Sequence, residues 1–288
     1  MESVGNLGRS TALKSAFILA LSALFASPSA LAHKAKNSVV CNAPSGVPST
    51  SLLLLGELHG SKESPKLAGE IVCGEALKAP VVLALEIPTT EQSPVDRFLA
   101  SNGGAGAKAE LLSHQFWQAD VDGRASAAMF ELIAYMRKLK HAGLPVSVFA
   151  FARGGARRHI TRQAALADSL RDFVKQHPNL SMVVLTGNVH GSQAPFLQFG
   201  NGPKIIPTGY LIRDLHPVSV LIAHPTGTIW ACINDSCNVH PIKGGWGATL
   251  PPAHFHDQAP MEGYGISYML RHITASPPAV SGLRHVSQ

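Results

Sequence analysis

The chain has 288 residues, of which 45% are hydrophobic and 15% are charged, and its formal net charge is +6. The basic residues are scattered, except for a group around Arg153, Arg157, Arg158 and Arg162, and aromatic residues do not alternate with them. This pattern favours a solvated face over a nucleic-acid interface, so we expect no nucleic-acid partner.

The first 32 residues have the pattern of a secretory signal peptide. Arg9 and Lys14 give a basic start, residues 16–26 are continuously apolar, and Ala30-Leu31-Ala32 supplies small residues for signal peptidase. The apolar run is too short to cross a membrane, which takes about 20 residues. We therefore expect an exported protein, periplasmic or extracellular, with no transmembrane span in its mature part. That part has 256 residues, enough for one large domain or two small ones.

Four cysteines lie beyond the signal peptide, and an even number in an oxidising compartment predicts disulfides. Three pairings are open. Cys232 and Cys237 flank a turn-like segment, so we favour this pair together with Cys41–Cys73. Zinc binding is the alternative, but two cysteines at this spacing without a second close pair are poor zinc ligands.

Short apolar runs alternate with helical patterns along the chain. Residues 33–50 are polar and rich in Pro and Ser, which predicts a mobile lead-in to a single domain over residues 51–272. Apolar runs at 51–55, 81–87, 145–152 and 182–186 are typical of buried parallel strands. Helical spacing follows Pro65 and recurs at 128–139 and 164–174. This order predicts an α/β fold with a mostly parallel central sheet flanked by helices.

The pattern changes after residue 200. Residues 218–223 and 228–233 flank Pro225-Thr226-Gly227, which predicts a C-terminal antiparallel hairpin that extends one edge of the sheet. Residues 273–288 lack periodicity, so we expect a disordered tail there.

Polar residues follow three of the apolar runs at the points where they stop. Glu57 and His59 lie in Gly-Glu-Leu-His-Gly, Glu86 precedes Pro88, and His190 lies in Gly-Asn-Val-His-Gly. The carboxyl ends of parallel strands share one edge of a sheet, where ligands bind. A single histidine at a strand end is usually a hydrogen-bonded structural residue, but four such residues at three strand ends favour a shared site.

This set permits two kinds of chemistry. The carboxylates and imidazoles could hold a divalent metal that activates water, which makes all four residues candidate metal ligands. Without a metal, one His or Glu could act as a general base. Two buried glutamates close together would raise the pKa of one of them. Glu63 could join the cluster or cap the helix near Pro65.

Other candidates are weaker. His254 and His256 alternate and could chelate a metal or haem if they lie on a strand, but they stand in a Pro-rich segment. Asp168 and His159 could belong to a serine triad, but the chain has no Gly-x-Ser-x-Gly motif, and no phosphate-binding or dinucleotide glycine pattern appears.

Several motifs resemble one superfamily, which contains the erythromycin esterase-like, ChaN-like haem-binding and Tiki/TraB proteins. GELHG, LALEIP and LTGNVHG resemble its three strand-end motifs, and the segment RQAALADSL is similar to a helix of the family that begins with Arg, here Arg162. Phe116-Trp117 and Asp122-Gly123-Arg124 resemble a segment of exported members. The resemblance covers about residues 51–200 and leaves the last third of the chain unmatched.

The resemblance implies an α/β fold with a site at Glu57, His59, Glu86 and His190. Its members include esterases with a histidine base, metal-dependent peptidases and haem binders, so it implies no single activity. The first hypothesis is an exported hydrolase of a small molecule or peptide, metal-assisted or with a His/Glu base, in which Arg162 pairs with a carboxylate. The second is a haem- or iron-binding protein without catalysis, with Tyr210, Tyr264 and Tyr268 as further ligands. The third is a non-catalytic envelope scaffold, against which the intact set of four residues argues.

Overall fold

The computed structural model describes residues 39–119, 122–153, 161–233, 236–242, 245–246 and 250–280. The expected signal peptide, residues 281–288 of the expected tail, and Arg157, Arg158 and His159 lie outside the described residues. Within the described part, no helix has the length and apolar character needed to cross a membrane.

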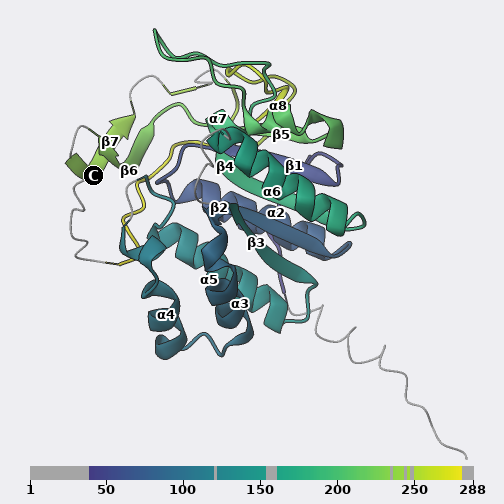
Figure 1. Ribbon diagram of the computed structural model, residues 1–288, viewed down its shortest axis with the longest axis vertical. Coiled ribbons are helices and arrows are strands. Elements are labelled where there is room, and N and C mark those ends of the chain that lie inside the picture. Colours follow the sequence, from purple (N-terminus) through teal and green to yellow (C-terminus); the bar gives the residue numbers. More distant parts are fainter. Residues whose placement is uncertain are drawn as a thin grey trace, which may run out of the picture.

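A seven-stranded sheet forms the centre of the molecule (Figure 1). Its strand order is β3-β2-β4-β1-β5-β9-β8, and all neighbours are parallel except β8 and β9. The strands are β1 (Leu52–Glu57), β2 (Val81–Pro88), β3 (Val146–Ala152), β4 (Ser181–Gly187), β5 (Val218–Ala223), β8 (Phe255–His256) and β9 (Ile266–Met269). The predicted α/β class with a mostly parallel sheet is confirmed.

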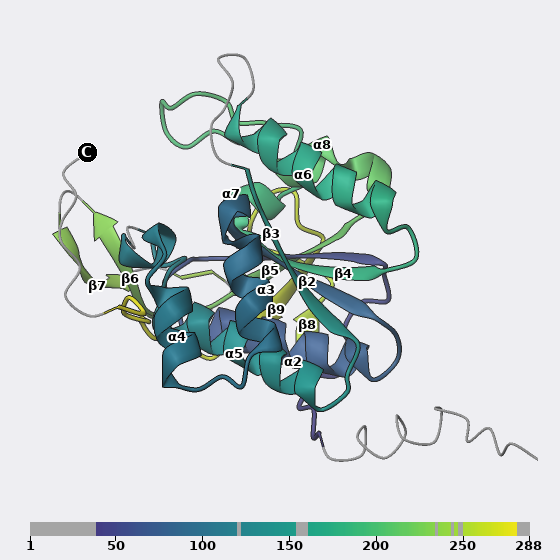
Figure 2. The same cartoon turned by 60° about the horizontal axis from the view of Figure 1, so that its bottom comes forward.

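Helices cover both faces of this sheet (Figure 2). One face carries α2 (Glu63–Ala76), α3 (Gln92–Ala100) and α5 (Ala127–His141), with α4 (Ala105–Leu112) against α3. The other carries α6 (Arg162–Gln176) and α8 (Thr208–Leu211), and α7 (Asn188–Gly191) follows β4 directly. The described residues also form the short 3₁₀ helices η1 (Thr89–Glu91), η2 (Gln115–Gln118) and η3 (Arg213–Leu215).

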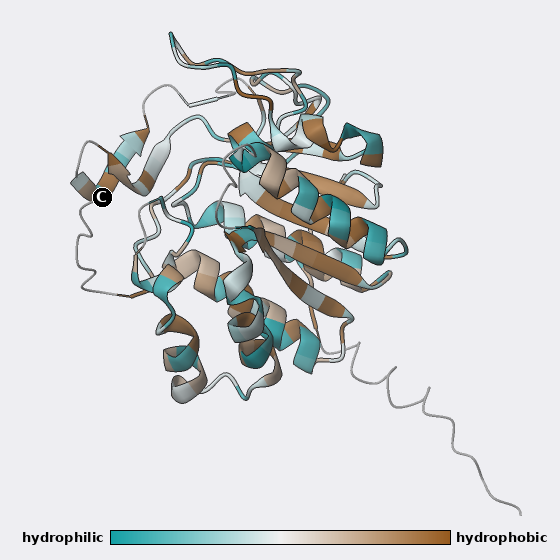
Figure 3. Cartoon of the chain, in the orientation of Figure 1, coloured by the Kyte–Doolittle hydropathy of each residue, from teal (hydrophilic) through white to brown (hydrophobic). Residues whose placement is uncertain are grey.

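The core has two layers because alternate residues of each strand point to opposite faces. Leu53 and Leu55 of β1 pack into the layer with α2 and α5, whereas Leu52 and Leu54 pack towards α6. The strands are accordingly hydrophobic throughout, and helices such as α6 carry hydrophilic residues on the side turned away from the sheet (Figure 3). Burial of both faces explains why the strands appear in the sequence as continuous apolar runs.

The C-terminal hairpin is present, but it is built from other residues than expected. β6 (Gly227–Ile233) pairs with β7 (Ser236–Ile242) and stands apart from the main sheet (Figures 1 and 2). The expected partner segment, 218–223, is instead β5, which lies parallel to β1 inside the sheet. Its apolar residues are buried on both faces by the layers that pack on the sheet, and its two edges pair with β1 and β9.

Residues at both ends of the domain pack against it, whereas the sequence predicted a mobile lead-in and a disordered tail. Residues 273–280, expected as part of a disordered tail, cross the ends of several elements, with Ile273 and Ala275 buried. The Thr228 amide donates to the Ile273 carbonyl, and the Ala127 amide donates to the Pro277 carbonyl. Residues 39–50, expected as a mobile lead-in, include Val39 and Cys41, which pack against the core.

Two disulfides join the cysteines in the favoured pairing. Cys41–Cys73 attaches the lead-in to α2 over a sequence separation of 32 residues. Cys232–Cys237 closes the β6–β7 hairpin over a separation of 5 residues. Zinc ligation is therefore excluded for these four cysteines in this state, since none of them is free.

We expect the two disulfides to stabilise the fold unequally, because a cross-link restricts the unfolded chain more when it closes a longer loop. Loop-closure entropy gives about 4 kcal/mol for Cys41–Cys73 and about 2 kcal/mol for Cys232–Cys237. The free energy of unfolding of the Cys41→Ser/Cys73→Ser and Cys232→Ser/Cys237→Ser double variants, measured in urea, checks this order. A larger loss in the hairpin variant would contradict the loop-length argument.

Candidate functional site

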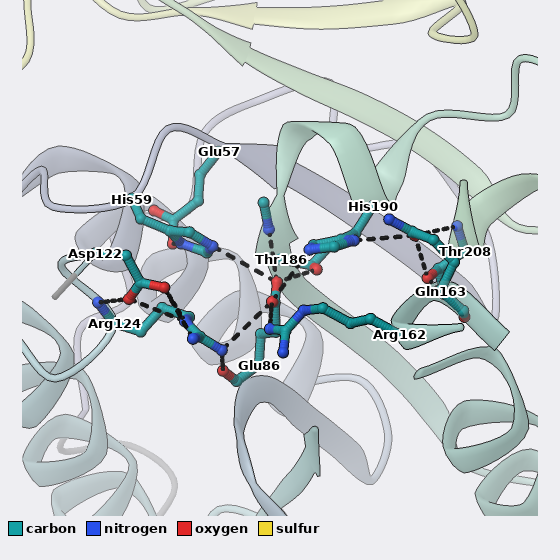
Figure 4. A network of polar contacts seen from close by, with 11 residues as sticks. Glu57, His59, Glu86, Asp122, Arg124, Arg162, Gln163, Thr186, His190 and Thr208 are labelled. Atoms are coloured by element: carbon teal, nitrogen blue, oxygen red, sulfur yellow. Dashed lines mark hydrogen bonds and ion pairs between the residues drawn. The ribbon is translucent and has the colours of Figure 1, made fainter. Parts of the chain in front are cut away.

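Three neighbouring strands bring the four predicted residues to one place (Figure 4). Glu57 ends β1 and is followed by His59, Glu86 lies near the end of β2, and His190 lies on α7 just after β4. In the sheet, β4 lies between β1 and β2. The carboxylate of Glu86, which is 2% exposed, forms the centre of the network.

Each oxygen of Glu86 has its own set of partners. Oε1 accepts a hydrogen bond of 2.6 Å from Arg162 and lies 3.3 Å from His190 Nε2 and 3.5 Å from Arg124 Nη1. Oε2 accepts hydrogen bonds from the Thr186 hydroxyl at 2.6 Å and the Gly187 amide at 2.9 Å, and it lies 3.6 Å from His59 Nε2. The sequence-based pairing of Arg162 with a carboxylate is thus observed.

These contacts determine the charge of Glu86. Burial by itself opposes ionisation, but His190 and His59 outweigh it and hold the pKa of Glu86 well below its usual range. We had expected two glutamates in one site to raise the pKa of one of them. For Glu86 the structure shows the opposite, because basic side chains stand between it and Glu57.

His59 lies between the two glutamates. Its Nδ1 donates to Glu57 Oε1 at 2.9 Å while Nε2 faces Glu86. Burial opposes protonation of the ring, but the hydrogen bonds and charges of Glu57 and Glu86 raise the pKa of His59 to about 10. His59 is therefore an imidazolium at neutral pH, with both of its N–H groups directed at carboxylates.

His190 is held by an amide instead of a carboxylate. The Thr208 amide donates to Gln163 Oε1 at 2.9 Å, which identifies this atom as the carbonyl oxygen. His190 Nδ1, 3.0 Å from the same oxygen, must therefore donate to it. This contact leaves Nε2 of His190 turned towards Glu86 and fixes the ring in one orientation.

The turn that carries His59 packs tightly against the Asp122-Gly123-Arg124 segment. A Cβ on Gly60 or on Gly123, both at positive φ, would collide with backbone atoms: those of Trp230 for Gly60 and those of Gly60 itself for Gly123. Asp122 binds Arg124 at 2.8 Å, and Arg124 also donates to the Glu86 carbonyl at 3.2 Å. Glycine at both positions thus allows the Arg124 loop to approach the site.

A tyrosine fills the space beneath the two histidine-bearing turns. The Tyr264 hydroxyl donates to the Asn188 carbonyl at 2.5 Å, and a Cβ on Gly56 or Gly191 would collide with it. Burial raises the pKa of Tyr264. Neither Gly56 nor Gly191 has a positive φ angle. Glycine is needed at these positions because a Cβ would displace the Tyr264 ring.

The arrangement of donors does not fit a metal ion at the expected four ligands. Both Glu86 oxygens are already bound by hydrogen-bond donors, one of which is Arg162, and the Arg124 guanidinium lies 3.5 Å from Oε1. Both nitrogens of His59 face carboxylates, so only the unpartnered Glu57 Oε2 is open as an anionic ligand. Across the described ranges, no group of three or more His, Cys, Asp or Glu residues is arranged to hold a metal.

The other candidates lie apart from this network. Glu63 begins α2, and its carboxylate accepts from the Thr274 amide at 2.7 Å. His256 lies on β8, at the far edge of the sheet, and its Nε2 is hydrogen-bonded to the Pro251 carbonyl. His254 lies just before β8. Tyr210 packs against Arg213, and Tyr268 against Phe255. The tyrosines and histidines proposed as haem ligands are therefore not gathered at one point.

Sequence reasoning missed part of the site. Gln163 and Thr208, which orient His190, carry no recognisable motif, although Gln163 follows Arg162 directly. His224 was also missed: it follows β5 at the same edge and is buried, and neither ring nitrogen has a hydrogen-bond partner in the described part of the chain. Burial lowers the pKa of His224.

Comparison with known proteins shows similarity of fold without similarity of sequence. No family model and no curated protein matches the chain. A solved protein from Bacillus cereus matches with a TM-score of 0.54 and 11% identity, over 87% of this chain and 98% of that one. A succinoglycan biosynthesis protein matches with a TM-score of 0.54 and 9% identity, over 78% and 89%. An erythromycin esterase mutant in its open conformation matches with a TM-score of 0.41 and 9% identity, over 68% and 76%.

The two matches with a TM-score of 0.54 establish the fold alone. The α/β architecture implied by the sequence motifs is confirmed, while membership of the superfamily stays a prediction.

We expect the free energy of unfolding to fall as pH rises from about 6.5 to about 10. In that window the folded state keeps a proton on His59 that the unfolded chain releases, so the folding equilibrium constant drops by up to about tenfold per pH unit. The contribution is fully present below the unfolded pKa. Urea unfolding at a series of pH values should show this slope in the native protein and in the exposed control His254→Gln. It should be absent from His59→Gln, and equal slopes in all three proteins would contradict the assignment.

Proposed function

We propose that this protein is an exported hydrolase that cleaves an ester or amide bond by His/Glu chemistry without a metal. The observation that supports the proposal is the pair of imidazoles that face one buried carboxylate under different constraints. His59 is cationic between two glutamates, whereas His190 is oriented by the neutral amide of Gln163. An acid and a base placed side by side are the minimum needed to activate water and stabilise the resulting oxyanion.

His190 is the general base in this mechanism. In its neutral form the ring keeps its proton on Nδ1, which donates to Gln163, so Nε2, beside Glu86, is the nitrogen that can take a proton. A water molecule at Nε2 gives up its proton to His190 as its oxygen forms a bond to the substrate carbonyl carbon. Glu86 Oε1, 3.3 Å from the same nitrogen, stabilises by its negative charge the imidazolium that forms, while Gln163 is the group that holds the ring from behind at Nδ1.

His59 and Arg162 supply positive charge for the oxyanion. His59 Nε2 faces the same carboxylate from the other side, and the Arg162 side chain is 50% exposed at the mouth of the site. Collapse of the tetrahedral intermediate breaks the bond to the leaving group, which takes the proton from His190 Nε2. The products are a carboxylic acid and an alcohol or amine, and His190 returns to its starting state.

Export is part of the proposal. It rests on the signal-peptide pattern of residues 1–32 and on the two disulfides, which are typical of proteins in oxidising compartments. The haem- or iron-binding alternative has less support, since the Nε2 atoms of His59 and His190 are turned towards Glu86. Of the candidate tyrosines, Tyr264 is bound to the Asn188 carbonyl, and Tyr210 and Tyr268 lie elsewhere.

We expect hydrolysis of a panel of p-nitrophenyl esters and anilides to depend on both histidines. Loss of the base in His190→Ala should lower kcat by about 10²–10⁴-fold. Loss of the cation in His59→Gln should lower it by about 10²–10³-fold. His254→Gln, an exposed change at the far edge of the sheet, is the control and should keep native activity. Native rates in the His190→Ala variant would rule out its role as the base.

We expect elemental analysis of the mature protein, purified without chelator, to find less than stoichiometric transition metal, and EDTA to leave kcat/KM unchanged. The reason is that the Glu86 oxygens are already bound by hydrogen-bond donors. About one bound metal per chain, lost in both His59→Ala and Glu86→Ala, would instead place a metal at the site and overturn the metal-free mechanism.

A further inference from the structure

A hollow of about 250 Å³ adjoins the site and shares Arg124 with it. We call it the side hollow. Among the described residues it is lined by the end of β2 with η1, by η2 with the residue after it, and by the loop before α5: Pro88, Thr90, Glu91, Gln115, Phe116, Ala119, Asp122, Arg124 and Ala125. Its volume is below the ~300–1,000 Å³ typical of pockets for whole drug-sized ligands, so it suits one arm of a larger molecule.

A buried acid in the side hollow has no use in the hydrolytic mechanism. Glu91 is only 4% exposed, and its Oε2 has no hydrogen-bond partner among the described residues, while the nearby Trp117 side chain partly opposes the rise in the pKa of Glu91. The charge of His114 acts on Glu91, but within the described part of the chain the two form no ion pair. Burial raises the pKa of Glu91. A buried carboxylate without a partner is costly, so an arriving group that supplies one is favoured.

The other polar groups of the side hollow restrict what that partner can be. Asp122 is already bound by Arg124, with oxygen-to-nitrogen distances of 2.8 Å and 3.0 Å, so its charge is neutralised. Glu91 therefore leaves an excess of negative charge in the side hollow. One carboxylate is too few ligands for a metal ion, but it is sufficient for an ammonium group. Phe116 also lines the hollow, and an aromatic ring is a favourable neighbour for an organic cation.

We propose that the side hollow binds an organic ammonium group carried by the substrate, with Glu91 as its counter-ion and Phe116 as its apolar wall. This inference rests on the proposed hydrolase function, and it names the class of substrate: an ester or amide with a protonated amine on one arm. Arg124, which reaches both the side hollow and Glu86, places that arm next to the two histidines.

Direct binding of two probes of equal size tests the proposal independently of turnover. Benzylammonium carries the charge, and benzyl alcohol is its neutral counterpart. By isothermal titration, the native full chain should bind benzylammonium at least tenfold more tightly than benzyl alcohol. Glu91→Gln should remove this preference, whereas Glu131→Gln, the same change of charge at an exposed position on α5, should keep it. Circular dichroism of each variant verifies folding.

The outcomes separate the two proposals. Equal binding of both probes by the native protein overturns the ammonium site, whether or not Glu91→Gln folds. A preference that persists in a folded Glu91→Gln also overturns it. Glu91-dependent benzylammonium binding without hydrolysis of any ester contradicts the proposed function and supports the ammonium site. With an active ester, Glu91→Gln should raise KM at least tenfold for an amine-bearing substrate and leave KM for its neutral analogue unchanged.

Discussion

The buried carboxylate of Glu86 and the positively charged groups around it hold the site together. An ion removed from water is tolerated only if hydrogen bonds and opposite charges replace its hydration. Here the replacements come from β4, α6, the His59 turn and the Arg124 loop, which are far apart in the sequence. Each of these segments is therefore placed relative to one anion, and loss of Glu86 would leave several cationic groups without a counter-ion.

The two histidines differ because of what stands behind them. Glu57 adds a second negative charge to His59 and keeps it protonated, whereas the neutral amide of Gln163 orients His190 without adding charge. In the proposed mechanism the same kind of side chain therefore serves as an electrostatic stabiliser at one position and as a base at the other. Partners of this kind, and not the identity of the catalytic residues alone, determine how acid and base roles are divided.

The similarity of fold to proteins of about 10% identity has a simple physical origin. A parallel sheet covered on both faces is specified by short apolar runs, which many sequences satisfy, and its strand ends converge whatever residues they carry. Activity depends on the side chains placed there. Glu91 and the side hollow illustrate this: the loops that follow β2 and precede α5 form a feature that the sheet itself does not require.

The sequence by itself determined the parallel sheet and the strand-end residues Glu57, His59, Glu86 and His190, and it favoured one of three disulfide pairings, because periodicity, cysteine spacing and parallel topology act through local or regular patterns. Only the tertiary structure decided the pairing of residues 218–223 with β1, the packing of residues 273–280, and the depressed pKa of Glu86. These three features depend on which segments, distant in the sequence, contact one another in the folded chain. The partners of His190 show the same limit: Gln163 and Thr208 are separated by 45 residues, and no local pattern reports that they converge on one imidazole.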